Sequence, residues 1–365
     1  ASLRPRLLSL SYKTGYEKVA PILNVLLVVA LAVVLVLKLG GGQQAGPELE
    51  QGRKQKYVMV AIATNASYWI DSKAGFEDKG AELGVEALFT GAPNVDANQQ
   101  IDYIERAIAE GVDGIVTVPA SDALTPVIDK AIAKGIPVVC VDTDAPSSKR
   151  FSFIGTGNYE AGFRGGEHLG KLLNGKGKVA ILTVPGQDNL MQRVDGYKDA
   201  LKKWPDIEVI AELNDQSSNT EGLKVARAIL QSRPDLTAFA CVEATGGVSA
   251  ATAVKEAGKA GKIKLVAMDR DDPTLRLIEE GVIDASVAQR SYTMTYTALQ
   301  LLYNLRNGQV KLVDDWKAAD VNPLPPHIDT GSFLITPETA AMFYQEQSAG
   351  VGAAEPPLEE APANQ

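Results

Sequence analysis

Polar and charged side chains follow several short apolar stretches of this 365-residue chain. Asp142 comes directly after the stretch 137–141, and Asp269 comes two residues after the stretch 264–267. The candidate contact residues, which include an aromatic pair, are Tyr68, Trp69, Asp142, Asn158, Arg193, Glu243, Asp269 and Gln289. Carboxylates accept hydrogen bonds, whereas amides and guanidinium groups donate them. This mixture suits the hydroxyl groups of a small polar ligand such as a sugar, and the ring of Trp69 suits the apolar face of a sugar.

A structural alternative exists for each of these residues. Asp and Asn side chains often cap helices by accepting hydrogen bonds from the first backbone amides. Asp142, Asn158 and Asp272 are plausible caps of this kind. A single position does not separate the two roles, but polar residues that recur after so many apolar stretches favour a binding site.

The motifs that would indicate an enzyme or a cofactor are absent from the sequence. Gly155-Thr156-Gly157 lacks the third glycine of a dinucleotide fingerprint, because position 160 is Glu. There is no P-loop and no Gly-x-Ser-x-Gly elbow. His168 and His327 are the only histidines, and neither belongs to a cluster with metal-ligand spacing. We therefore expect no catalytic residue, no metal and no cofactor, and a structural or surface role for His168.

The elements that must position the candidate residues alternate between strand and helix. The first half has expected strands at 57–63, 86–90, 114–118 and 137–141, and helices at 68–83, 97–110 and 123–134. The pattern restarts near Phe151, with strands at 178–182, 208–211, 238–242, 264–267 and 285–288, and helices at 159–173, 190–203, 220–231, 247–257, 273–280 and 292–307.

Apolar strands between amphipathic helices are typical of a parallel sheet that is covered on both faces. The sequence therefore predicts an α/β protein with two doubly wound parallel-sheet lobes. In such sheets ligands bind beyond the carboxyl ends of the strands, which is where the candidate residues are expected.

Residues 19–37 indicate the compartment. These 19 residues contain no charged side chain, and a helix of this length can cross a hydrocarbon core of about 30 Å. Arg4, Arg6, Lys13 and Lys18 precede them, so the positive-inside rule predicts a cytoplasmic N-terminus and export of the remainder. Because the segment is long and lacks an obvious cleavage site, we expect a retained transmembrane anchor, with a cleaved signal sequence as the alternative.

Composition narrows the remaining choices. A net charge of −9 argues against nucleic acid as a partner. Cys140 and Cys241 each lie in an apolar stretch, so buried free thiols are favoured over a disulfide, which needs Cα atoms within about 7 Å. Residues 348–365 are rich in Ala, Pro, Glu and Gly and are expected to form a disordered tail.

Several short motifs occur in a specific order. They are Tyr68-Trp69 before Lys73-Ala74-Gly75, GIVTVP at 114–119, GIPVV at 135–139, FIGTGN at 153–158, RVDGY at 193–197, VAMD at 266–269 and GVIDA at 281–285. In this order they resemble the type I periplasmic sugar-binding proteins of the ribose-binding kind, the substrate-binding proteins of ABC transporters. The resemblance covers about residues 56–344.

The resemblance implies roles for the candidate residues. Tyr68 and Trp69 would flank the sugar ring, and Glu243 would be a further contact. Hydrogen bonds to the hydroxyl groups would come from Asp142, Asn158, Arg193, Asp269 and Gln289. The sequence departs from the family pattern at Ala66, Thr143 and Val242 and lacks an expected aromatic near Ser217. These departures argue against ribose itself and leave another sugar or polyol as the expected ligand.

The resemblance also implies a domain layout with three crossings between lobes, near 155–156, 289–290 and 317–322. The expected parts are a cytoplasmic segment 1–18, an anchor 19–37, a linker 38–55, an N-terminal lobe of 56–155 and 290–320, a C-terminal lobe of 156–289 and 321–347, and the tail 348–365. We expect a monomer that closes on its ligand outside the cytoplasm and delivers it to the transmembrane subunits of an ABC permease. The alternatives are a tethered component of a sugar or autoinducer sensing system and an α/β enzyme.

Overall fold

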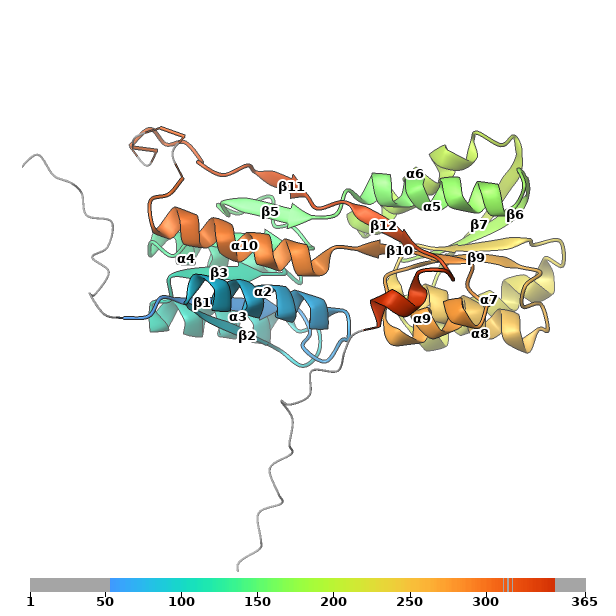
Figure 1. The fold of residues 1–365 in the computed structure, drawn as a ribbon, viewed down its shortest axis with the longest axis horizontal. Helices are drawn as coiled ribbons and strands as arrows, with labels where there is room; N and C mark the ends of the chain where they lie inside the picture. Colours follow the sequence, from blue (N-terminus) through green and yellow to red (C-terminus); the bar gives the residue numbers. More distant parts are fainter. Residues whose placement is uncertain (1–52, 311, 314, 317, 345–365) are drawn as a thin grey trace, which may run out of the picture. The chain divides into compact units, whose positions relative to one another are not determined.

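The computed structural model describes residues 53–344 except 311, 314 and 317. This part contains two lobes, each built on a six-stranded sheet with helices packed against it (Figure 1). The first sheet has the order β11-β5-β4-β3-β1-β2. Its strands are β1 (Lys56–Ala61), β2 (Glu86–Gly91), β3 (Gly114–Thr117), β4 (Val138–Val141), β5 (Ser152–Gly155) and β11 (His327–Asp329), and every neighbouring pair is parallel.

Helices cover both faces of the first sheet, because alternate residues of a strand point to opposite faces. The helices are α2 (Trp69–Leu83), α3 (Ala97–Glu110), α4 (Thr125–Ala133) and α10 (Ser291–Arg306), with a short 3₁₀ helix η1 (Asp122–Leu124). Tyr57 and Met59 of β1 belong to the apolar core shared with α2 and α10. Val58 and Val60 belong to the core shared with α3 and α4.

The second sheet has the order β12-β10-β9-β8-β6-β7, and only β12 runs antiparallel, against β10. Its strands are β6 (Lys176–Thr183), β7 (Asp206–Asn214), β8 (Ala238–Cys241), β9 (Lys264–Met268), β10 (Ala285–Gln289) and β12 (Ser332–Ile335). Its helices are α5 (Asn158–Leu172), α6 (Asp188–Leu201), α7 (Asn219–Ser232), α8 (Ala244–Glu256) and α9 (Asp272–Glu279), with the 3₁₀ helix η2 (Ala340–Phe343). Val179 and Ile181 of β6 pack with α5 and α6, and Ala180 and Leu182 with α7 and α8.

Two α/β lobes with parallel sheets were predicted from the sequence, and the structure confirms them. The chain passes between the sheets after β5, after β10 and after β11. The sequence placed the third crossing near 317–322, which is too early. β11 still pairs with β5, through His327 and Phe153 at the start and Asp329 and Gly155 at the end, so the crossing follows Asp329.

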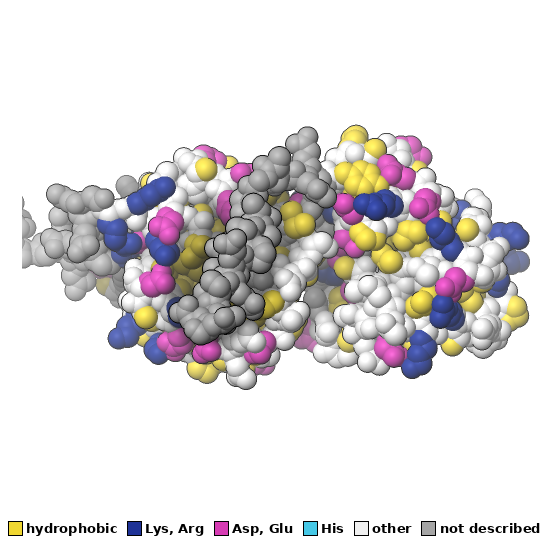
Figure 2. Space-filling model, turned by 90° about the horizontal axis from the view of Figure 1, so that it is seen from below, with side chains coloured by type: hydrophobic (Ala, Val, Ile, Leu, Met, Phe, Trp, Pro, Cys, Tyr) yellow, Lys and Arg dark blue, Asp and Glu magenta, His cyan; other side chains and the backbone are white. Residues whose placement is uncertain are grey.

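Four predicted segments lie wholly or nearly wholly outside the described residues: the cytoplasmic segment 1–18, the anchor 19–37, the linker 38–55 and the tail 348–365. Within residues 53–344, apart from the three gaps, none of the helices has the length and apolar character needed to span a bilayer. Cys140 in β4 and Cys241 in β8 are buried free thiols, as expected. Figure 2 shows basic and acidic side chains interspersed on one face of the protein.

Candidate ligand-binding site

Arg193 of α6 is the centre of a buried hydrogen-bond network. Its side chain lies among residues of the second lobe, and the residue is only 4 % exposed. Nε donates to Asn158 Oδ1 at 2.8 Å, Nη1 to the carbonyl oxygen of Val242 at 2.9 Å, and Nη2 to Gln289 Oε1 at 3.0 Å. One guanidinium group therefore joins the start of α5, the residue after β8 and the end of β10.

Gln289 extends this network in two directions. Its Oε1 also accepts a hydrogen bond from Thr156 Oγ1 at 2.9 Å, and its Nε2 donates to Asp269 Oδ1 at 3.0 Å. Thr156 lies in the first crossing between the sheets, and Gln289 ends the strand before the second crossing. The network therefore includes the residues at which the chain changes lobes.

A close approach of two helices sets the position of Arg193. A Cβ atom on Gly162 of α5 would lie 1.9 Å from the backbone oxygen of Arg193, a distance that no side chain could occupy. Glycine therefore lets α5 and α6 touch at this point. Because Asn158 lies at the start of α5, this contact brings its side chain within hydrogen-bonding distance of Arg193.

Asp142 and Asp269 share an uncommon backbone conformation. Each directly follows a strand, β4 or β9, and their φ angles are 64° and 67°. Left-handed backbone is uncommon for residues other than glycine, although aspartate tolerates it better than most, and it is often found at functional sites. The amide of Asp142 donates to Ile154 O at 3.0 Å and that of Asp269 to Val287 O at 2.9 Å, so hydrogen bonds to the neighbouring strands hold both turns.

The aromatic pair opens α2 in the first lobe. Tyr68 is half-buried, and its hydroxyl group donates to Asp142 Oδ1 at 2.5 Å. Its ring packs edge-on against Trp69, with ring centroids 4.8 Å apart and an interplanar angle of 87°. Trp69 is only 6 % exposed and belongs to the core that also contains Phe76 and Val139. The structure therefore places Tyr68 beside Asp142, whereas most of the Trp69 ring lies in the core.

The carboxyl groups are shifted toward protonation. Burial is the main cause, and it raises the pKa of Asp142 and raises the pKa of Asp269 to about 7. The positive charge of Arg193 opposes the rise at both residues. Burial also raises the pKa of Tyr68 well above its usual value, with further contributions from the charges of Asp142 and Asp269. Tyr68 and Asp142 of the first lobe therefore lie within electrostatic range of Asp269 and Arg193 of the second.

The capping alternative holds for one residue of the candidate set, Glu243. Its carboxylate accepts hydrogen bonds from the amides of Thr245 at 2.9 Å and Gly246 at 2.5 Å, and from Thr245 Oγ1 at 2.8 Å, so it caps α8. Neither Asn158 nor Asp272 acts as a cap, because each is the first residue inside its helix. The cap positions belong to Gly157 and Asp271, and neither makes a side-chain capping hydrogen bond. A direct contact between Glu243 and a ligand stays a prediction.

Residues 57–309 match the family described as the periplasmic binding protein domain. The chain is a member of this family. The resemblance found in the sequence motifs is thereby confirmed, and the two parallel-sheet lobes agree with the type I architecture.

Relatives of this periplasmic binding protein are named for sugars. It is 28% identical over 271 residues to the D-allose-binding periplasmic protein of Escherichia coli (strain K12), an alignment that covers 71% of this chain and 87% of that protein. The crystal structure of a sugar-binding protein of a sugar ABC transporter from Bacillus halodurans is 35% identical, with a TM-score of 0.76. The match covers 80% of this chain and 100% of that protein's chain. The arabinose-binding protein AraP from Geobacillus stearothermophilus is 36% identical, with a TM-score of 0.75 and the same coverage.

Two buried polar residues of this periplasmic binding protein were missed in the sequence. Thr156 lies in the FIGTGN motif and at the first predicted crossing between the lobes, but it is not among the candidate contact residues, although it directly follows β5. Asp215 directly follows β7 and is fully buried. The expected strand ended at residue 211, whereas β7 continues to Asn214, so Asp215 was not recognised as a strand-end residue.

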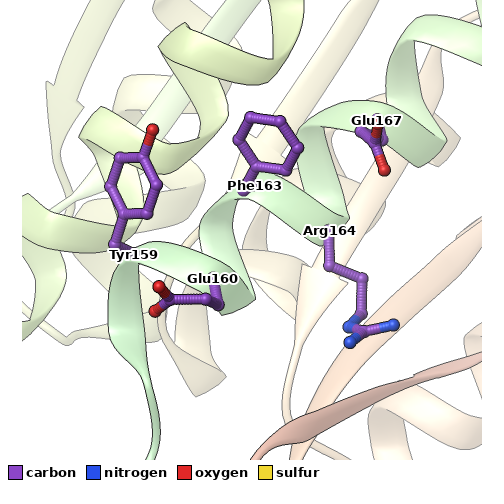
Figure 3. A pocket seen from close by; sticks show the side chains of 5 residues that line it. All are labelled: Tyr159, Glu160, Phe163, Arg164 and Glu167. Carbon is purple, nitrogen blue, oxygen red and sulfur yellow. The ribbon is translucent and has the colours of Figure 1, made fainter.

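A separate hollow of about 340 Å³ lies on the surface of α5. It is lined by Tyr159, Glu160, Phe163, Arg164 and Glu167, which project from one side of the helix (Figure 3). The rings of Tyr159 and Phe163 stack at 6.1 Å. Glu167 forms an ion pair with Lys203, and the Tyr159 hydroxyl group donates to Asp199 at 2.9 Å. None of the candidate contact residues lines this hollow, and several of its polar groups already have protein partners.

The described residues contain no group of three His, Cys, Asp or Glu side chains placed to hold a metal ion. His168 lies half-buried in α5, and burial is the main cause that lowers its pKa. Its environment is that of a packed helix face, in keeping with the structural or surface role expected from the sequence.

Proposed function

We propose that this periplasmic binding protein is the substrate-binding component of an ABC-type importer, which closes on a sugar or polyol and delivers it to the permease. The observation that carries the proposal is the buried network in which Arg193 joins Asn158, Val242 and Gln289, and Gln289 joins Asp269. It lies after β8, β9 and β10, at the sheet edge where ligands of parallel α/β proteins bind.

The network keeps hydrogen-bonding capacity for a ligand. A guanidinium group has five N–H donors. Within the described residues, Arg193 uses three of them. Gln289 uses one of its two N–H groups, for Asp269 Oδ1. The remaining donors, together with Asp269 Oδ2, match hydroxyl groups that both donate and accept. Because the protein contacts already fix the side chains, little ordering is left to oppose binding.

The proposed contact residues come from both lobes. Tyr68, Trp69 and Asp142 belong to the first, and Asn158, Arg193, Glu243, Asp269 and Gln289 to the second. We propose that the ligand is held between these two sets and that the lobes close around it by bending at the three crossings. Given its burial, Trp69 would contribute the edge of its ring, and Tyr68 would present its hydroxyl group together with Asp142.

We further propose an extracytoplasmic location, with residues 19–37 as a retained anchor and the binding part acting as a monomer. The relatives named above as a periplasmic protein and as a transporter component support the location and the permease as partner. Sequencing the N-terminus of the mature protein from its host tests the anchor. A mature chain that starts after residue 37 would replace it with a cleaved signal.

The decisive test of function is calorimetric titration of the full chain with ribose, allose, arabinose, xylose and their polyols. Names of relatives make allose and arabinose the first choices. We expect one of these compounds to bind with a 1:1 stoichiometry, and the same compound to raise the melting temperature. Amino acids of similar size serve as the control. Binding of an amino acid with no response to any sugar or polyol would contradict the proposal.

A further inference from the structure

Asp215 carries a buried carboxyl oxygen that lacks a partner. The residue directly follows β7 and is 0 % exposed. Its Oδ1 accepts a hydrogen bond from the amide of Ser217 at 3.1 Å, but its Oδ2 has no partner among the described atoms. A buried acceptor without a partner is costly and uncommon, so this oxygen requires an explanation.

Glu243 supplies the missing partner if a proton lies between the two groups. A Cβ atom on Gly246 would lie 3.0 Å from Asp215 Oδ2 and 3.1 Å from Glu243 Oε1, so both oxygens border the same small space. Glu243 is itself only 8 % exposed. Two buried carboxylates this close repel each other, and one of them keeps its proton more readily. Burial, and after it the charge of Glu243, raise the pKa of Asp215 to about 7.

We propose that Asp215 and Glu243 share one proton, and that Asp215 is thereby a positioning residue for the sugar site. The pair then carries a single negative charge. Protonated Asp215 donates from Oδ2 to Glu243, while ionised Glu243 accepts from the amides of Thr245 and Gly246 at the start of α8. A negative charge at a helix N-terminus is favourable, which explains why the charge stays on Glu243.

The Asp215–Glu243 pair affects the sugar site through the peptide group between Val242 and Glu243. Glu243 follows Val242, whose carbonyl oxygen accepts the hydrogen bond from Arg193 Nη1 at 2.9 Å. If Asp215 loses its proton, repulsion moves the Glu243 carboxylate away from α8 and shifts this carbonyl group relative to Arg193. The inference rests on the proposed function, because the position of Arg193 matters for binding only if Arg193 contacts the ligand.

The chain around Asp215 is strained in a way that fits a positioning role. Gln216 and Ser217 have φ angles of 57° and 47°, two consecutive left-handed residues that are not glycine. Such strain persists only where the surroundings impose it. The hydrogen bond from the Ser217 amide to Asp215 Oδ1 is one such constraint. A second is the bond from the Asp215 amide to Thr183 O at 3.1 Å, which ties the turn to β6.

Among the described residues, the thiol of Cys241 at the end of β8 is a further titratable group that interacts electrostatically with the pair. Burial raises the pKa of Cys241 well above its usual value, and the charges of Asp215 and Glu243 raise it further. Tyr197 of α6 interacts electrostatically with Cys241 in turn, and burial is the main cause that raises the pKa of Tyr197. Both groups are therefore neutral near pH 7, so within this cluster the proton of the carboxyl pair is the one that titrates there.

The first test follows the proton itself. In the full chain labelled with ¹³C at aspartate carboxyl groups, we expect the Asp215 signal to titrate with a midpoint near 7 rather than near the ordinary value of 3.8. Asp215→Asn identifies the signal by removing it. Glu243→Gln should lower the midpoint, because it removes the repelling charge. A midpoint near 3.8 in the unaltered protein, or one unchanged by Glu243→Gln, would overturn the shared proton.

The second test measures binding of arabinose and allose from pH 6 to pH 8. We expect the affinity of the unaltered chain to fall as pH rises through 7. The fall should be at least about threefold smaller in Asp215→Asn, because the amide donates without ionising. The change that remains in this variant comes from Asp269, whose pKa is also raised to about 7. Asp215→Ala should weaken binding at least about tenfold at pH 6. If Asp215→Ala does not fold, Gly246→Ala provides the loss variant, since its methyl group enters the space between the carboxyl groups.

The two tests separate the two proposals. If neither arabinose nor allose nor any other sugar binds the unaltered chain, the proposed function fails, and the titration of Asp215 still decides whether the proton is shared. If a sugar binds and Asp215 titrates near 7, but Asp215→Asn loses as much affinity as Asp215→Ala, the positioning role is wrong. Asp96→Asn is the control, because Asp96 caps α3 and its pKa is lowered by hydrogen bonds to Gln99 rather than raised.

Discussion

Arg193 and Gln289 are joined by a buried hydrogen bond of 3.0 Å although 96 residues separate them in the chain. The bond connects α6 with the end of β10, directly before the chain returns to the first lobe. Gln289 also accepts from Thr156, directly after the chain first leaves that lobe. A ligand that contacts Arg193 would therefore act on two crossings at once, which links occupancy of the site to the angle between the lobes.

Replacement of Arg193 is expected to affect both binding and stability. A hydrogen bond to a charged group contributes about 1.5–3 kcal/mol, so Arg193→Ala should weaken sugar binding roughly tenfold to more than a hundredfold. The unpaired Asn158 and Val242 oxygens should also cost about 1–3 kcal/mol each in the free energy of unfolding. Calorimetry and chemical denaturation measure the two effects.

Arg164→Ala is the matched control for this experiment. Arg164 lies on the exposed side of α5 and donates to Ser332 Oγ at 3.3 Å, away from the network. We expect its replacement to leave affinity within about twofold. Normal sugar affinity in folded Arg193→Ala would contradict the assignment of Arg193 as a ligand contact.

Asp269 should make stability fall as pH rises. Burial raises its folded-state pKa to about 7 from 3.8, so the folded protein holds a proton that the unfolded chain has already released. The stabilisation is complete below pH 3.8 and is lost as the pH rises through 7. The full difference corresponds to about 4 kcal/mol. Unfolding free energies at pH 5 and pH 8 should differ less in Asp269→Asn than in the unaltered protein.

Asp235 is the control, because its pKa is shifted in the opposite direction from that of Asp269. Hydrogen bonds to Arg233 and Lys178 lower the pKa of this exposed carboxyl group. Its contribution is present above the unfolded-state pKa and is lost at acid pH. Asp235→Asn should therefore leave the change between pH 5 and pH 8 intact. If Asp269→Asn and Asp235→Asn alter the difference in unfolding free energy between pH 5 and pH 8 by the same amount, Asp269 is not the cause of that difference.

Gly162 should be required for binding because it lets α5 touch α6. In Gly162→Ala the new methyl group would meet the backbone oxygen of Arg193, so the helices must separate. Overpacking of this kind costs about 1–3 kcal/mol. Gly170→Ala is the matched control, because its methyl group would meet the Trp204 ring about 12 Å further along the same helix. Both variants should lose stability, but only Gly162→Ala should also lose sugar affinity. Equal affinities in the two variants would exclude this positioning role.

The sequence predicted the central strands better than the edges of the sheets. Apolar stretches with polar residues after them located Asp142, Asp269 and Gln289, because central parallel strands are buried on both faces. β7 is an edge strand whose residues alternate between half-buried and exposed positions, so its end and Asp215 were missed. β11 has only three residues, too few for a periodic pattern, and its pairing with β5 joins segments far apart in the chain.

Side-chain direction was the other part that the sequence did not determine. The pair Tyr68-Trp69 opens α2, and either ring could face a ligand or the core. The structure buries Trp69 and leaves Tyr68 half-buried beside Asp142. Glu243 likewise follows a strand as a contact residue would, but its carboxylate caps α8. Such choices depend on packing between elements, which residue spacing does not encode.

An ion pair between the lobes is expected to favour the closed form. Arg270, directly after Asp269, donates to Asp71 of α2 in the first lobe, and also to the backbone oxygen of Phe343 at 2.8 Å. The side chains of Arg270 and Asp71 are 22% and 16% exposed, so the pair is partly shielded from water. We expect Asp71→Asn to weaken sugar binding by a factor of about two to five, equivalent to about 0.4–1 kcal/mol.

The same variant tests closure directly. Small-angle scattering of the unaltered protein should give a smaller radius of gyration with bound sugar than without it, because the lobes bend toward each other at the crossings. At saturating sugar, Asp71→Asn should keep a larger radius than the unaltered protein. Asp78→Asn is the control, because Asp78 accepts from Tyr292 of α10 within the first lobe. A radius of gyration that does not change when sugar binds would contradict closure of the lobes. Equal radii for Asp71→Asn and Asp78→Asn at saturating sugar would show that the ion pair between Arg270 and Asp71 does not favour the closed form.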